Sequence, residues 1–82
     1  MPAATGKLDR TRRDLDTRRL RDLLRSEVLS GTFRDGQLPS EASLMIEYRC
    51  SRATVRAALD LLRGAGLIER MQGTGTFVVA ER

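Results

Sequence analysis

Glycine and proline divide this 82-residue chain into short segments, and that division limits the folds open to it. Gly31 ends a first helical pattern, and Pro39 precedes a second. Gly64 ends a third, and a Gly73-Thr74-Gly75 turn lies near the carboxyl end. Because glycine and proline are unfavourable inside helices, each pattern should form a separate short helix. The division predicts three helices followed by a hairpin.

The first helix is expected from about Thr17 to Ser30, with Asp16 or Thr17 as its amino-terminal cap. Residues 1–14 precede it and are charged and poor in apolar side chains, so burial cannot offset the entropy lost on ordering them. We therefore predict a mobile basic tail over 1–14 and a folded domain over 15–80. The apolar side chains that share one side of this helix are Leu20, Leu23, Leu24 and Val28.

The second and third helices are shorter, and each begins after a serine. Ser40 should cap a helix over about 41–49, and Ser51 should cap a helix that runs to Gly64. The buried stripe of the third helix follows the i, i+3, i+4, i+7 spacing: Val55, Ala58, Leu59 and Leu62.

The last segment changes from a helical to a strand-like pattern. Residues 67–72 and 76–79 are expected to pair around the glycine-rich turn, with a short third strand near Gln37 and Leu38. The fold class is therefore mainly α with a small β-hairpin (α+β), with three helices and a two- or three-stranded sheet. The expected core is Leu20, Leu24, Val28, Leu44, Val55, Leu59, Leu62 and Phe77.

The chain is basic, with 15 Lys and Arg against 11 Asp and Glu, a net charge of +4 and a pI near 10.5. Residues 1–25 hold eight basic and four acidic residues, which accounts for the whole excess. Such a charge favours a polyanionic partner, either nucleic acid or an anionic membrane surface. The tail could lie along a phosphate backbone or minor groove, or it could simply be solvated.

The composition argues against an enzyme. The chain has no histidine and a single cysteine, Cys50, which cannot build a typical zinc site or a histidine-based triad, so no metal or cofactor is expected. The first 30 residues contain no apolar run, so we expect no signal peptide, no membrane partner and a cytoplasmic location. Three aromatic residues are too few for a platform that stacks single-stranded bases.

Two short helices joined by a tight turn match a helix-turn-helix pattern. When the buried stripe of the third helix points inward, Ala53, Arg56, Ala57 and Asp60 point outward, and Arg52 and Thr54 flank the first turn. Small side chains let a helix backbone approach a DNA groove, and arginine matches the acceptors of guanine.

Each of these residues also has a structural explanation. Arg56 could pair with Asp60 on a solvated surface, because the two are four residues apart. Arg52 could be solvated, and Ser51 could act as a helix cap alone. The helix-turn-helix pattern favours DNA contact for the set rather than for any single residue.

Four motifs stand in order along the chain, and they resemble the DNA-binding domain of GntR-type bacterial transcription regulators over about residues 17–80. The motifs are Leu38-Pro39-Ser40-Glu41, Ser51-Arg52-Ala53-Thr54-Val55-Arg56-Ala57-Ala58-Leu59, Gly66-Leu67-Ile68-Glu69 and Gly73-Thr74-Gly75-Thr76-Phe77-Val78.

This resemblance implies a winged helix-turn-helix that binds palindromic double-stranded operators as a homodimer in transcription regulation, as a repressor. The third helix (about 52–63) would enter the major groove, and the wing tip (72–75) would reach the minor groove. An effector ligand is expected only if a further domain exists outside this chain. The candidate DNA-binding residues are Ser40, Ser51, Arg52, Ala53, Thr54, Arg56, Gln72, Gly73 and Thr74.

Five positions depart from the family pattern. Ala42 stands where many relatives carry an arginine that touches DNA, so that contact is absent. Met45 replaces a small alanine, Ile46 replaces a polar residue, and Cys50 replaces a valine. Arg49 replaces a glycine in the turn, where a left-handed backbone would be mildly strained for arginine.

Three other functions remain open from the sequence. The chain could be a plasmid or phage protein that binds DNA in copy or transfer control, or a winged helix that binds protein. An enzyme is the remaining alternative. Because the sequence shows no long heptad stripe, we expect a monomer in solution that pairs on DNA.

Overall fold

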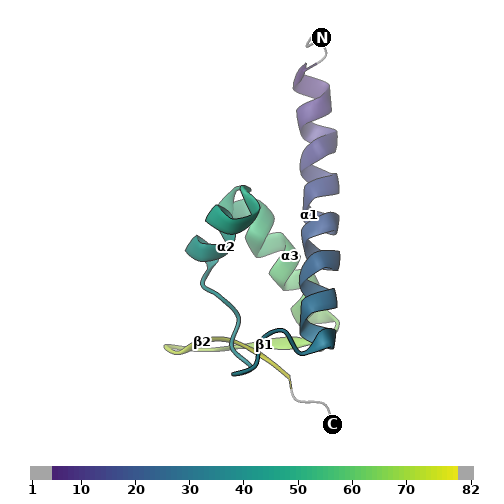
Figure 1. Ribbon diagram of the computed structural model, residues 1–82. Coiled ribbons are helices and arrows are strands. Elements are labelled where there is room, and N and C mark those ends of the chain that lie inside the picture. Colours follow the sequence, from purple (N-terminus) through teal and green to yellow (C-terminus); the bar gives the residue numbers. More distant parts are fainter. Residues whose placement is uncertain (1–4, 80–82) are drawn as a thin grey trace.

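The chain folds into three helices followed by a two-stranded antiparallel hairpin, which confirms the predicted fold class (Figure 1). The structure is a computed structural model that describes residues 5–79, with residues 5–16 described by their backbone alone. The elements are α1 (Thr5–Ser30), α2 (Glu41–Tyr48), α3 (Arg52–Gly64), β1 (Ile68–Met71) and β2 (Gly75–Val78).

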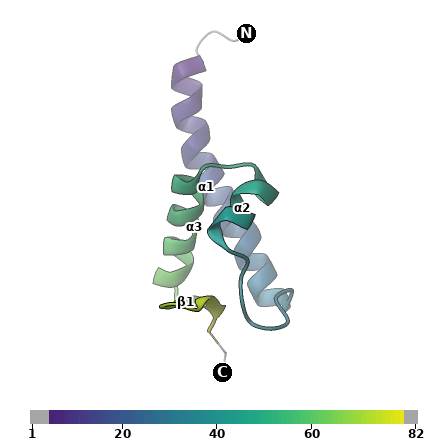
Figure 2. The ribbon, with the colours of Figure 1, turned by 90° about the vertical axis from the view of Figure 1, so that its left-hand side faces the viewer.

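The first helix begins at Thr5, so the predicted start at Thr17 is wrong. No glycine or proline occurs between Lys7 and Ser30, and most residues there have good helix propensity. The predicted start relied on the scarcity of apolar side chains in residues 1–14. That scarcity argues against burial of the segment but not against a helix. Residues 1–4 of the predicted tail lie outside the described residues, and its mobility stays a prediction. In Figures 1 and 2 the amino-terminal part of α1 extends beyond the other elements.

Serine caps begin α2 and α3, as predicted. The Oγ of Ser40 accepts a hydrogen bond from the backbone N–H of Ser43 at 3.1 Å, and the Oγ of Ser51 accepts one from Thr54 at 3.1 Å. Each cap satisfies a backbone donor that the first turn of a helix leaves unpaired. The two caps set where the helices of the helix-turn-helix begin.

The core lies where α1, α2, α3 and β1 meet. Six of the eight predicted core residues are buried, and Leu59 is half-buried against them. The prediction for Phe77 is wrong, because Val78 is the β2 residue that packs against the core. The buried residues are Leu20, Leu24, Val28, Leu38, Leu44, Val55, Ala58, Leu62 and Ile68.

The register of the hairpin explains the error at Phe77. Val78 pairs with Ile68 on the core side, and Phe77 pairs with Glu69. Successive side chains of a strand point to opposite faces, so a one-residue error in phase exchanges inside for outside. The predicted third strand is present as one isolated bridge between Gln37 and Phe77.

The turn between α2 and α3 depends on a left-handed residue. Arg49 ends α2 with φ 53° and ψ 53°, the left-handed backbone that the family resemblance implied for this position. It is the only non-glycine residue with positive φ among the described residues. Three other positions depart from the family pattern near this turn. Met45 and Cys50 are half-buried and pack against the core, while Ile46 is exposed.

Tyr48 links the end of α2 to α1. Its hydroxyl donates to the two carboxylate oxygens of Glu27, at 3.3 and 3.4 Å. Burial, the negative charges of Glu27 and Glu47, and the hydrogen bond to Glu27 raise the pKa of Tyr48 to about 12. The folded chain therefore holds the phenolic proton more tightly than an unfolded chain does.

We expect Arg49→Gly to stabilise the chain, because glycine adopts positive φ without the strain that arginine has there. The entropy of the unfolded glycine chain offsets part of the gain, which leaves about 0.5 to 1 kcal/mol. Denaturant unfolding measures the difference. The matched control is Arg34→Gly, at an exposed position without positive φ, which should lower stability. A lower stability for Arg49→Gly would contradict the assignment of strain.

Stability should fall as the pH rises from 10 to about 12, because folding raises the pKa of Tyr48 from its ordinary value of 10.0 to about 12. The contribution of Tyr48 is complete below the unfolded pKa and is lost as the pH passes through the folded pKa. Tyr48→Phe should flatten this decline. The check is the free energy of unfolding of both proteins across that range; equal slopes would show that Tyr48 is not responsible.

Candidate nucleic-acid interface

The helix-turn-helix presents one face of α3 to solvent. The predicted orientation of α3 is confirmed for Val55, Ala58 and Leu62, which are buried, and for Ala53, Arg56 and Asp60, which are exposed. Leu59, expected inward, and Ala57, expected outward, are both half-buried. Figure 2 shows α2 and α3 joined at one end by a short turn, which is made of residues 49–51. The buried stripe therefore determines which side of α3 is free to meet a partner.

The amino end of α3 carries four of the candidate residues, of which Ala53 is exposed. Ser51 and Arg52 are exposed, as expected for a binding surface. Thr54 is only 4% exposed, and its hydroxyl lies 3.0 Å from the Oγ of Ser51. In this position Thr54 orients the cap and the start of α3. A direct contact of Thr54 with DNA stays a prediction.

Arg56 forms an ion pair with α2 and not with its own helix. Its Nε lies 3.4 Å from Oε2 of Glu41, and its side chain stays 59% exposed. Asp60 pairs instead with Arg63, three residues later, at 2.7 Å. The alternative pairing of Arg56 with Asp60 is therefore wrong, because each has another partner. The Glu41 side chain is 29% exposed, but the guanidinium of Arg56 is largely open to solvent, which weakens the pair. Arg56 can therefore exchange Glu41 for another acceptor.

The wing tip is a tight, exposed turn at residues 72–74. Thr74 donates twice to the carbonyl oxygen of Met71, from its backbone N–H at 2.9 Å and from its hydroxyl at 3.1 Å. Gly73 has a φ of 83°, in the left-handed region that glycine occupies most easily. The three candidate residues of the tip, Gln72, Gly73 and Thr74, thus lie together at the end of the hairpin.

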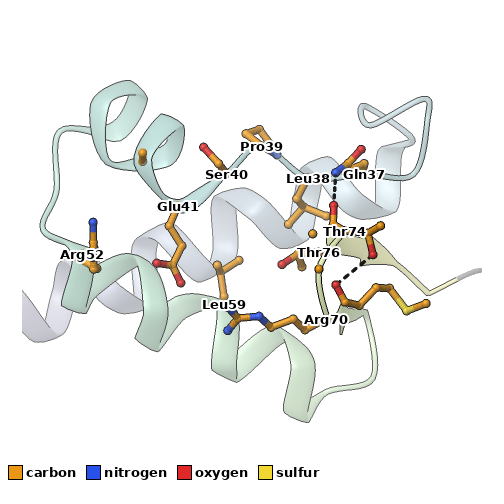
Figure 3. A pocket seen from close by; sticks show the side chains of 14 residues that line it. Gln37, Leu38, Pro39, Ser40, Glu41, Arg52, Leu59, Arg70, Thr74 and Thr76 are labelled. Carbon is orange, nitrogen blue, oxygen red and sulfur yellow. Dashed lines mark hydrogen bonds between the residues drawn. The ribbon is translucent and has the colours of Figure 1, made fainter.

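A cleft of about 510 Å³ lies between the start of α2, α3 and the wing. Arg52 of α3 lies at one side of the opening and Thr74 of the wing tip at another, with Ser40 between them along the segment before α2 (Figure 3). The start of α3 and the wing tip therefore share one concave surface.

Arg70 is a candidate that the sequence pattern did not single out. It comes from β1 and lines the cleft together with Arg52 (Figure 3). A neighbouring hollow of about 310 Å³ also includes Arg70 and adds Arg56. The available signal was the strand period: Ile68 is buried, so Arg70 two residues later points to the same side of the sheet. Three arginines from two elements thus line one continuous surface.

The described residues contain no cluster of histidine, cysteine, aspartate or glutamate that could hold a metal ion. In the same part of the chain, no helix has the length and apolar character needed to cross a membrane. Beside the carboxylate of Glu41, this surface offers guanidinium groups and hydroxyls, which suit an anionic, hydrogen-bonding partner.

Comparison with solved structures supports the assignment of the fold. The chain is similar to the N-terminal domain of AraR, whose crystal structure is a complex with mutant ORR3. The TM-score is 0.72 with 33% sequence identity, over 77% of this chain and 91% of the other. The three helices and hairpin therefore form a winged helix-turn-helix.

Curated relatives lead to the same family. The chain is 39% identical over 66 residues to the mannosyl-D-glycerate transport/metabolism system repressor MngR of Escherichia coli (strain K12), which covers 79% of this chain. It is 46% identical over 55 residues to the arabinose metabolism transcriptional repressor of Halalkalibacterium halodurans, which covers 66% of this chain. The chain spans only 28% and 15% of the lengths of these two relatives.

The family described as bacterial regulatory proteins, gntR family, matches residues 16–78. This match includes α2, α3 and the wing, and it extends over most of the described residues. Transcription regulators of this family are not enzymes, which confirms the prediction made from composition. The chain belongs to the GntR family of bacterial transcription regulators, as a winged helix-turn-helix DNA-binding domain.

Proposed function

We propose that this domain represses transcription by binding a specific palindromic operator in double-stranded DNA. In this proposal α3 reads the major groove and the wing tip at 72–75 reaches the minor groove. The observation that carries it is the cleft where Arg52 at the start of α3 and Thr74 at the wing tip share one opening. A duplex that holds α3 in its major groove can present the adjacent minor groove to the wing tip across this opening.

The chemistry of the surface supports base reading by α3. The guanidinium of Arg56 is accessible, and its planar fork matches O6 and N7 of guanine. Ala53 is exposed and small, so the helix backbone can approach the floor of a groove. Arg52 and Arg70 add positive charge at the edges, where phosphates would lie.

The amino ends of α2 and α3 suit the phosphate backbone. Ser40 and Ser51 are exposed at these ends, where backbone N–H groups and the helix dipole favour an anion. In this proposal each serine keeps its capping bond and adds a phosphate contact. The two residues would then orient the domain on the duplex, while Arg56 would supply sequence preference.

Repression is supported by the names of the relatives, since both curated relatives described above are called repressors. An effector for this protein is part of the proposal only if a further domain accompanies the chain. The sugars and sugar derivatives in the names of those relatives belong to those proteins alone.

Arg56→Ala should weaken binding to a selected operator by about 1 to 3 kcal/mol and relax preference at particular base positions. The reason is that alanine removes the guanidinium without disturbing the buried stripe. Binding titrations against the operator and its single-base variants measure both effects. The matched control is Arg25→Ala, which removes an exposed arginine of α1 that lines neither the cleft nor the neighbouring hollow.

The pattern of loss separates the possible roles of Arg56. An equal loss on every duplex would show that it holds phosphate only. No loss would remove it from the interface, and a wild-type chain that prefers no duplex sequence would overturn the proposed function. In that case binding to protein would become the alternative to test.

A single domain should bind a half-site much more weakly than a full palindrome. One recognition helix reads only a few base pairs, and two copies facing a palindrome double the sequence that is read. We expect a monomer without DNA at micromolar concentration and two copies on the full site. Sedimentation with and without each duplex checks this. A tight dimer without DNA, or equal affinity for half and full sites, would contradict it.

A further inference from the structure

The segment before α2 is joined to the base of the wing through its backbone. The N–H of Leu38 donates to the carbonyl oxygen of Thr76 at 2.9 Å, and the N–H of Val78 donates to that of Gly36 at 2.7 Å. A hairpin of two strands is marginally stable by itself in water. These bonds give the wing a third backbone neighbour near its base.

The side chain of Gln37 adds a contact farther out, at the wing tip. Its Nε2 donates to the carbonyl oxygen of Thr74 at 3.0 Å (Figure 3). Thr74 belongs to the turn that closes the hairpin, so this bond joins the tip to the segment that leads into α2. Both residues line the cleft that faces α3.

Gly75 makes room for this contact. A Cβ at Gly75 would lie 2.6 Å from Nε2 of Gln37, which is closer than real Cβ atoms approach a neighbour. The φ of Gly75 is 131°, which also disfavours any other residue. The carboxamide of Gln37 therefore occupies space that a side chain at position 75 would fill.

We propose that Gln37 is a positioning residue for DNA binding, which holds the wing tip at a set place relative to α3. This inference rests on the proposed function, because its benefit is that α3 and the tip can enter two grooves together. Without the bond the tip would occupy other positions, and the apparent affinity would fall with the fraction of molecules in the competent form. Gln37 itself needs no contact with a base.

The test is Gln37→Leu, which keeps a side chain of similar size and removes the donor. Its matched control is Ser30→Ala, which removes exposed hydrogen bonds at the end of α1, away from the cleft. The duplex is a palindrome selected by the wild-type chain from a random-sequence pool. Backbone ¹⁵N relaxation of the free protein reports the order of residues 72–75, and thermal unfolding confirms that each variant folds.

Gln37→Leu should lower the order of the tip and weaken duplex binding about two- to tenfold, the effect of losing one exposed hydrogen bond. Hydroxyl-radical protection of the minor groove should decrease, while protection of guanine N7 in the major groove should persist. Ser30→Ala should change none of these. A tip of unchanged order, or a less ordered tip with unchanged affinity and footprint, would overturn the inference.

A second variant tests whether Gln37 needs the space at position 75. Gly75→Ala should displace the carboxamide, so Gln37→Leu should have little further effect on the order of the tip in that background. Additive effects would contradict the proposal. The relaxation measurements need no DNA, so they test the contact even if the wild-type chain shows no preference among duplexes, a result that would overturn the proposed function separately.

Discussion

The packing of α3 against α1 is the constraint on which the rest of the structure depends. Val55 and Leu62 of α3 and Leu24 of α1 have no exposed surface, and a domain of this size has few other residues with which to form a core. Because this stripe turns one side of α3 inward, the opposite side, with Arg56, must face solvent. The orientation of the reading helix is thus a consequence of burial and does not require any contact with a partner.

The helix caps were the part of the fold that the sequence predicted well, because they depend on residues close together in the chain. A serine cap requires only the serine and a backbone donor three residues later, so Ser40 and Ser51 could be identified without knowing the tertiary structure. The start of α1 and the place of Phe77 could not be predicted. A charged helix that extends beyond the core has no apolar period to mark its start, and a short hairpin with apolar residues at successive positions has no unique phase.

The residues of the candidate site likewise include some that the sequence predicted and some that it did not. Arg52 and Arg56 could be selected because they follow from the buried stripe of a single helix. The pairing of Arg56 with Glu41 and the place of Arg70 beside the cleft could not, since both bring together segments separated along the chain. Arg56 is exposed although its partner Glu41 is half-buried, so the backbone holds this arginine in place while its side chain remains able to exchange partners.

One five-residue segment, 37–41, connects every part of the interface. The side chain of Gln37 bonds to the wing tip, Leu38 is buried in the core, and Ser40 caps α2. Glu41 then reaches Arg56 on α3. Pro39 restricts its own backbone and that of the residue before it, so the segment has few alternative conformations. A change in its path would move the wing, α2 and the partner of Arg56 together. The Leu-Pro-Ser-Glu motif therefore has a physical explanation in its contacts to the core, the helix cap and α3.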